Sequence, residues 1–262
     1  MIRVRILGSG TAIPSPVRGS PGLLLRGGDT TLLVDCGPGS LRAAAAAGVG
    51  PGDIDGVLLT HFHLDHTADL RALLFALRNP AFAGRPALSV TGPKGLADLL
   101  AQWFAADDGA WLEPLSYALH IREIGEGRHE VESLVVDAIP VDHTPQSLAY
   151  RIRASEDGPV VAVSGDTAPC DGIVQAGRHA DLFVLECAFP DGALHGKHLT
   201  PTTAGGVAAD ANPRSLVLTH FYPEVEGEPV VEIVSSRYVG EVHLAADGME
   251  FLVTTEATTL SP

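Results

Sequence analysis

The sequence predicts an α/β protein built as a four-layer αββα sandwich, with two β-sheets stacked face to face and helices on both outer faces. Two observations support this prediction. Strand-like stretches occur in both halves of the chain, and segments with helical spacing of apolar residues follow them in each half. Of the 262 residues, 45% are hydrophobic, which is enough for one shared core. We therefore expect a single domain over residues 1–262, made of β-rich halves of about 1–125 and 126–262.

The first half alternates between short strands and helices. Its opening strands flank the turn Gly27-Gly28-Asp29, which favours a hairpin, and Ser40 is expected to be the N-cap of the first helix. The leucines from Leu70 to Leu77 recur at helical spacing. The expected strands are Ile2–Leu7, Gly22–Arg26, Thr30–Asp35, Val57–Thr60 and Ala87–Thr91, and the expected helices are Ser40–Ala47, Thr67–Arg78 and Gly95–Phe104.

The second half follows an acidic, irregular stretch, Ala105–Glu113. Strands come first there, and strands and helices then alternate, as they do where helices cover one face of a sheet. The expected strands are Glu130–Ile139, Leu148–Arg153, Val160–Ser164, Leu182–Glu186, Leu216–Thr219, Val242–Leu244 and Met249–Val253, and the expected helices are Ala168–Ala176 and Thr202–Ala211.

Acidic residues outnumber basic ones by 32 to 17, which gives a net charge of −15. Lysine occurs only at Lys94 and Lys197, so few clustered cations are available for a long polyanion. The three isolated cysteines, Cys36, Cys170 and Cys187, favour a reducing compartment. The N-terminus lacks the core of a signal peptide, and no stretch approaches the roughly 20 apolar residues of a membrane span. We therefore expect a cytoplasmic protein that does not enter a membrane.

Three imidazoles and one carboxylate follow directly after the expected strand Val57–Thr60. Neighbouring histidines repel one another once protonated and are poor core fillers. In an extended segment His61 and His63 point to the same side, while Asp65 and His66 at the start of the next helix face a second point nearby. A surface His-rich loop or an expression artefact would not explain the apolar strand before them. The run therefore predicts ligands for two adjacent metal ions.

The motif HFHLDH resembles the HxHxDH signature of the metallo-β-lactamase superfamily, whose fold is the sandwich expected above. Further motifs of that family occur in order along nearly the whole chain: Asp35 in LVDCG, His143 in VDHT, Asp166 in SGDT and His220 in LTH. Each taken alone is more often structural, and SGDT by itself is turn chemistry. Their conjunction, each after an apolar strand, favours a shared site.

The resemblance implies a dinuclear metal-dependent hydrolase. One ion would be held by His61, His63 and His143, the other by Asp65, His66 and His220, and both by Asp166. Asp35 is expected to orient a ligand histidine through a hydrogen bond. This set of nitrogen and oxygen ligands suits two divalent ions, Zn²⁺ first, with Mn²⁺ or Fe as alternatives.

Within the superfamily the chain is similar to the ribonuclease Z-like branch, through the motifs LGSGTA, TGPKG, SGDT and LTH. That branch carries a Glu after the next strand and a His in a short HxT segment, which Glu186 and His198 match. The resemblance implies that these two act with Asp65 as catalytic residues. A carboxylate that fixes the imidazole tautomer lets the ring donate a proton to a leaving oxygen. The alternative for His198 is an exposed loop residue, and His195 is a nearby competitor.

The chain departs from ribonuclease Z in one segment. In that enzyme a long arm that grips transfer RNA lies between the motifs matched here by His143 and by SGDT, and the tight turn Ala154–Pro159 leaves no room for it. With the net charge of −15, this predicts a small-molecule substrate, a phosphodiester, and no extended nucleic acid. The branch also implies a homodimer.

Four functions are consistent with these observations. The favoured one is a phosphodiesterase acting on small diesters through a metal-bound hydroxide. The second is a hydrolase of a carboxylic ester, lactone, thioester or sulfate ester at the same site, and ribonuclease Z-type RNA cleavage is a further alternative. A non-hydrolytic redox protein ranks lowest, since related di-iron proteins usually carry Glu where this chain has His63, and they need a flavin domain.

Overall fold

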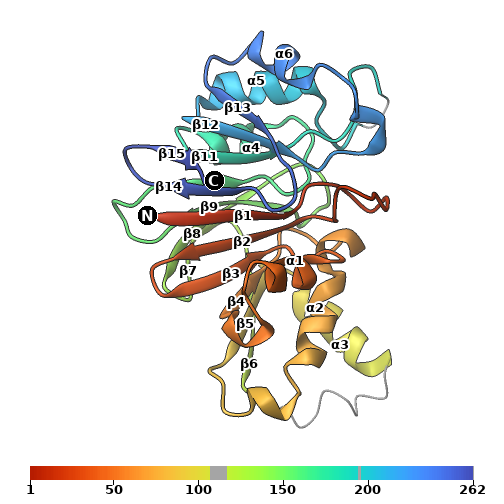
Figure 1. Cartoon of the computed structure of the whole chain (residues 1–262), viewed down its shortest axis with the longest axis vertical. Coiled ribbons are helices and arrows are strands. Elements are labelled where there is room, and N and C mark those ends of the chain that lie inside the picture. Colours follow the sequence, from red (N-terminus) through yellow and green to blue (C-terminus); the bar gives the residue numbers. More distant parts are fainter. Residues whose placement is uncertain (107–116, 194–195, 262) are drawn as a thin grey trace.

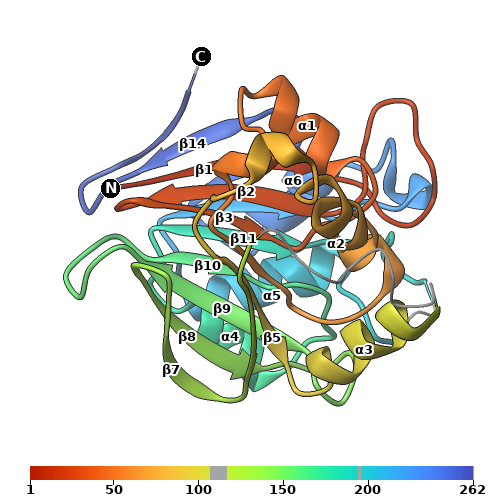
Figure 2. The same cartoon turned by 90° about the horizontal axis from the view of Figure 1, so that it is seen from below.

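The structure, a computed structural model, describes residues 1–106, 117–193 and 196–261. Two β-sheets face each other, and helices cover both outer faces, so the predicted four-layer αββα sandwich is confirmed (Figures 1 and 2). The division into one domain with two halves, and the homodimer, remain predictions. No helix among the described residues has the length and apolarity needed to cross a membrane.

The first sheet contains eight strands in the order β15-β14-β1-β2-β3-β4-β5-β6. It takes its strands from the first half of the chain and from the C-terminus, because β14 pairs antiparallel with β1. The strands are β1 (Ile2–Gly8), β2 (Gly22–Gly27), β3 (Thr30–Val34), β4 (Gly56–Leu58), β5 (Leu88–Pro93), β6 (Leu119–Ile124), β14 (Glu250–Val253) and β15 (Thr258–Leu260).

The second sheet contains seven strands in the order β13-β12-β11-β10-β9-β8-β7. Its strands are β7 (Gly127–Val131), β8 (Leu134–Pro140), β9 (Leu148–Arg153), β10 (Val161–Val163), β11 (Leu182–Glu186), β12 (Ser215–Thr219) and β13 (Glu241–Leu244). The last four, β10 to β13, run parallel to one another. Their carboxyl ends therefore meet at one edge of the sandwich, where the loops that follow them come together.

Alternation of side chains along the strands builds two cores. Leu32 of β3 points into the core between the sheets, whereas its neighbour Leu33 points outward under the helices. The outer core of the first sheet packs on helices of the first half, and those of the second half cover the other sheet (Figure 2). The helices are α1 (Ser40–Ala46), α2 (Leu64–Ala76), α3 (Leu96–Ala106), α4 (Asp171–Gly177), α5 (Pro201–Ala211) and α6 (Val230–Ser235), with single 3₁₀ turns at Pro51–Asp53, Pro80–Phe82 and Pro223–Val225.

Helices α2 and α4 begin three residues away from their predicted starts, α4 at Asp171 rather than Ala168, and the cap of α1 also differs from the prediction. Helix α2 begins at Leu64 rather than Thr67, with His63 in extended backbone as its N-cap residue, so Asp65 and His66 lie in its first turn. Helix α1 is preceded by Gly39 at φ 94°, and Ser40 is its first residue instead of its cap. A left-handed residue before the helix suits glycine, and it leaves the serine hydroxyl no capping position.

The strand expected over Glu130–Ile139 is a hairpin of two strands, β7 and β8, because Glu132 turns the chain at φ 52°. Strand β6 was not predicted, since four of its six residues are exposed and no apolar alternation marks it. Helix α6 and strand β15 were likewise missed. The irregular stretch expected over Ala105–Glu113 lies largely outside the described residues, although its first two residues end α3.

Candidate metal centre

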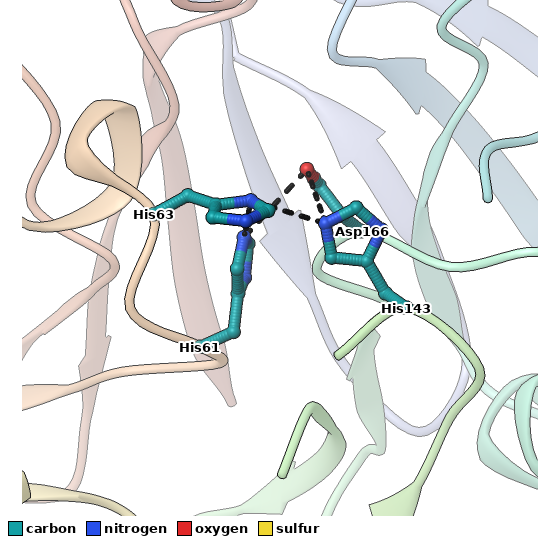
Figure 3. Close-up of side chains that lie close together, drawn as sticks. All are labelled: His61, His63, His143 and Asp166. Atoms are coloured by element: carbon teal, nitrogen blue, oxygen red, sulfur yellow. Dashed lines mark hydrogen bonds and ion pairs between the residues drawn. The ribbon is translucent and has the colours of Figure 1, made fainter. Parts of the chain in front are cut away.

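The predicted metal ligands come together at one edge of the sandwich, where segments from both sheets meet, and Figure 3 shows four of them. His61 and its neighbours follow β4 of the first sheet, and the other side chains follow strands of the second sheet. Parallel strands place their following loops side by side, which explains how residues far apart in sequence become neighbours. The residues supplied by the second sheet are His143 after β8, Asp166 after β10, Glu186 at the end of β11, His198, and His220 after β12.

The first cluster contains His61, His63, His143 and Asp166 (Figure 3). Nδ1 of His63 lies 3.0 Å from Nε2 of His61 and 3.1 Å from Nε2 of His143. Oδ2 of Asp166 lies 3.7 Å from Nε2 of both His61 and His143. These four ligand atoms all lie within 4.8 Å of one another, close enough to surround one cation.

The second cluster contains Asp65, His66 and His220, and Asp166 faces it as well. Nε2 of His66 lies 3.4 Å from Nε2 of His220, and each of these nitrogens is 3.2 Å from Oδ1 of Asp166. Oδ2 of Asp65 is 3.7 Å from Nε2 of His220. Asp166 therefore presents one oxygen to each cluster, which is the position of a bridging carboxylate.

The hydrogen bonds behind the imidazoles show what the cluster can hold. Nδ1 of His66 donates to Oδ2 of Asp35 at 2.7 Å, and Nδ1 of His143 donates to the carbonyl of Lys197 at 3.0 Å. Thr60 gives its hydroxyl hydrogen to Asp35, so its oxygen can accept from Nδ1 of His61 at 3.1 Å. In the neutral rings the remaining nitrogens carry lone pairs, and these face one another and Asp166. A metal cation satisfies that arrangement, so the residues fit bound metal ions.

The charges of the cluster agree with this interpretation. Burial raises the pKa of Asp166, but His220 and His66 outweigh it and hold that pKa well below its usual range. Burial and the neighbouring His66 and His143 lower the pKa of His61 well below its ordinary value. Burial also lowers the pKa of His66, yet Asp166 and Asp35 hold it well above the usual value. The two clusters therefore share an ionised carboxylate, that of Asp166, and its negative charge stabilises a cation beside it.

Asp35 supports the loop after β4, as expected, and does so through three hydrogen bonds. Its Oδ1 accepts from the Thr60 N–H at 2.8 Å, and its Oδ2 accepts from the Thr60 hydroxyl and from His66. Asp35 and His220 both have positive φ, 57° and 63°, where non-glycine residues are uncommon. Strain of this kind persists where surrounding structure fixes it, commonly at functional sites. Thr60 and the Lys197 carbonyl were not predicted as site groups, although both lie within one residue of a predicted site histidine.

Glu186 and His198 form the expected contact next to both clusters. Nδ1 of His198 lies 3.0 Å from Oε1 of Glu186, whose two oxygens also accept from the N–H groups of Thr167 and Leu199. Burial lowers the pKa of His198, but the hydrogen bond and charge of Glu186 raise it above its ordinary value. The side chain is 14% exposed, so His198 is not an exposed loop residue. Its competitor His195 lies outside the described residues.

His198 also has a second potential role. One of its ring nitrogens lies within 4.8 Å of ligand atoms of Asp166 and His220, so the geometry alone would allow it to bind a metal ion. Because Glu186 occupies Nδ1, the nitrogen that can face the clusters is Nε2. That nitrogen can either donate a proton or bind a cation, and the metal content of a His198→Ala variant separates the two roles.

Comparison with known proteins places this geometry in a family. The profile of the beta-lactamase superfamily domain matches residues 30–221. A Mycobacterium bovis protein named ribonuclease Z is 30% identical, over 94% of this chain and 96% of its own length. The crystal structure of human tRNase Z, short form, has a TM-score of 0.77 and 26% identity, covering 96% of this chain and 99% of that one. The metallo-β-lactamase fold protein YhfI from Bacillus subtilis has a TM-score of 0.80 at 24% identity, with 95% and 98% covered.

These relatives contradict one expectation from the sequence, the exclusion of extended nucleic acids as partners. Ribonuclease Z and tRNase Z are named for RNA substrates, and both align with almost the whole chain. The exclusion relied on a net charge of −15 and on the missing arm. Net charge sums over the whole surface, whereas RNA binding depends on the local potential, and two metal ions would form a large local positive charge. The exclusion was therefore wrong.

The family is shown by the length of the match as well as by the site. The profile extends from β3 to the residue after His220. It therefore includes the segment His61–His66 after β4 (the metal-site loop), both clusters and the Glu186–His198 pair (the dyad). This chain belongs to the metallo-β-lactamase superfamily of metal-dependent hydrolases and is a ribonuclease Z-like member of it.

Proposed function

We propose that this protein is an endoribonuclease of the ribonuclease Z type, which hydrolyses a phosphodiester bond of RNA. The observation that supports it most directly is the Glu186–His198 pair beside two clusters joined by Asp166. Phosphodiester hydrolysis needs groups that bind the phosphate and a proton donor for the departing oxygen. Both lie at one edge of the sandwich, and relatives at 30% identity are named for RNA cleavage.

We assign His61, His63 and His143 to one ion, Asp65, His66 and His220 to the other, and Asp166 to both. The chemistry of the donors favours Zn²⁺, with Mn²⁺ or Fe as alternatives. When bound, two such ions supply a hydroxide at neutral pH and neutralise charge on the phosphate. Burial raises the pKa of Asp65, but His220 and His66 lower it overall, so this side chain is an ionised ligand that can also orient the attacking water.

The remaining residues position groups and move one proton. Asp35 and Thr60 fix the rings of His66 and His61, and the Lys197 carbonyl fixes the ring of His143. Glu186 holds His198 with Nε2 available toward the clusters, and the raised pKa of His198 keeps the ring protonated to higher pH than a free imidazole. His198 then gives its proton to the oxygen that leaves phosphorus.

A second candidate, hydrolysis of small phosphodiesters, is favoured by one observation. Strands β9 and β10 pair antiparallel across a short connection of residues 154–160, so the RNA-gripping arm that ribonuclease Z carries between the matching motifs has no counterpart here. The same two clusters and dyad would serve such substrates, because the chemistry at phosphorus does not change.

The experiment that separates the candidates compares specificity constants of one metal-loaded preparation at moderate salt. The substrates are precursor transfer RNA, cyclic nucleotides, and chromogenic phosphodiesters, carboxylic esters and sulfate esters. We expect position-specific cleavage of the RNA. Hydrolysis of small diesters without RNA cleavage would favour the second candidate. Hydrolysis of carboxylic or sulfate esters alone would overturn both.

A further inference from the structure

Two aromatic side chains form a stack beside the dyad. The rings of Phe189 and Tyr222 have centroids 4.4 Å apart and planes inclined by 17°. They occupy equivalent positions in the parallel pair β11 and β12, where Glu186 lies opposite Thr219 and each aromatic comes three residues later. The Tyr222 N–H donates to the Ala188 carbonyl at 3.1 Å, which ties the two segments together.

The stack lies against the groups that handle the leaving oxygen. The Phe189 ring is 5.5 Å from the His198 ring, and the Tyr222 ring is 6.2 Å from that of His198 and 5.8 Å from that of His220. Phe189 is 7% exposed, whereas Tyr222 is partly exposed. Phe189 is therefore the inner ring and Tyr222 the outer ring at the rim of the site.

The Tyr222 hydroxyl has no hydrogen-bond partner within the described part of the chain. A tyrosine whose ring packs on one side and whose hydroxyl is unpaired suits a ligand that is flat and carries polar edges. A nucleobase has both properties. Base–aromatic stacking also tolerates any sequence, because every base has a π-face.

We propose that Tyr222, backed by Phe189, is the subsite that stacks the nucleobase of the leaving nucleotide. This inference rests on the proposed phosphodiester hydrolysis. In that reaction the oxygen of water bonds to phosphorus while the water gives up a proton to solvent, and the bond from phosphorus to the leaving oxygen breaks. His198 gives the leaving oxygen a proton and regains one from solvent. The sugar that carries the leaving oxygen must then lie on the His198 side of the site, within reach of the Tyr222 ring.

The alternative is that the two rings merely brace His198 and His220. A bracing role affects all substrates alike, whereas a stacking role depends on the presence of the base. The test therefore uses two short oligoribonucleotides of one sequence, one of which lacks the base at the leaving nucleotide. Specificity constants are measured for the wild type, Tyr222→Ala, Tyr222→Phe and Phe75→Ala, an exposed aromatic far along α2 from the metal-site loop.

We expect the wild type to prefer the substrate with the base by about 5- to 150-fold, the range that base–aromatic stacking supports. Tyr222→Ala should lose most of this preference, Tyr222→Phe should keep the part due to stacking and lose only what the hydroxyl adds, and Phe75→Ala should match the wild type. Equal rates of the wild type on both RNAs would overturn the inference, and this result does not depend on the folding of any variant. So would an unchanged preference in Tyr222→Ala.

Methyl p-nitrophenyl phosphate and bound metal are measured in parallel, so that the two proposals can fail separately. Hydrolysis of this diester by a wild type that treats both RNAs alike would remove the stacking subsite and leave the phosphodiesterase chemistry standing. If the metal-loaded wild type cleaves neither RNA nor the chromogenic diester, the proposed function itself is wrong. A parallel loss on both RNAs in Tyr222→Ala, together with lost metal, would show that the rings only brace the site.

Discussion

The two sheets supply residues of the metal centre from differently spaced positions in the sequence. The metal-site loop after β4, with the first turn of α2, supplies His61, His63, Asp65 and His66 within six residues. Asp35 and Thr60 hold this segment through hydrogen bonds. The second sheet supplies single residues from loops after different strands, and their spacing depends on strand register (Figure 1). The residues of the first set are neighbours in the sequence, whereas those of the second set become neighbours only through the fold. Each cluster combines residues of both sets, and Asp166 joins the two clusters, because its two oxygens face different ones.

The largest expected effect comes from removing that connection. Asp166→Ala should lower the bound metal from about two ions per chain to fewer than one, because both clusters lose an anionic ligand. Asp65→Ala is the matched control, since it removes a carboxylate from one cluster only and should leave about one ion. Elemental analysis after dialysis measures both. If Asp166→Ala kept two ions, the bridging role would be wrong.

The next largest effect tests whether His198, which comes from the second half of the chain, donates a proton or binds metal. His198→Ala should cut turnover by roughly 10²–10⁴-fold, since the leaving oxygen loses its proton donor. The loss should shrink for diesters with very good leaving groups, while metal content stays unchanged. His120→Ala, at an exposed histidine of β6, is the control. A drop in bound metal in His198→Ala would instead identify His198 as a ligand.

A smaller effect is expected at Asp35, which holds the metal-site loop through hydrogen bonds. Asp35→Asn should weaken metal affinity by about 10- to 100-fold, because an amide orients the His66 ring less well than a carboxylate. Competition with a chelator measures the change, and circular dichroism checks that the fold is kept. An affinity equal to that of the wild type would mean that the loop is held by its backbone alone.

The smallest effect concerns the contact between the two regions. The Tyr150 hydroxyl of β9 donates to the carbonyl of Leu59 at 2.6 Å, just before the metal-site loop. Tyr150→Phe should lower the free energy of unfolding by about 1–3 kcal/mol, because a buried acceptor loses its donor. Tyr117→Phe removes a similar bond, to Leu74 within the first half. Denaturant unfolding with and without metal compares them, and we expect only Tyr150→Phe to reduce the stabilisation that metal adds.

The sequence by itself determined the elements with strong local signals. The apolar run of β11 was predicted with the observed bounds, and HFHLDH identified four site residues because its members are neighbours on the chain. Strand β6 escaped prediction because its side chains are mostly exposed, and the β7–β8 hairpin because its turn residue, Glu132, is not a usual turn former. Local patterns report burial and backbone preference, so elements lacking both are not visible in them.

Only the tertiary structure decided how the distant residues relate. Motif resemblance assigned His143, Asp166 and His220 to the site, but the facing of each Asp166 oxygen toward a different cluster depends on how the two sheets pack. The Phe189–Tyr222 stack likewise depends on the pairing of Glu186 with Thr219 across two parallel strands. Such distances are set by long-range register and by burial in a shared core, and neither is encoded in the spacing of residues along the chain.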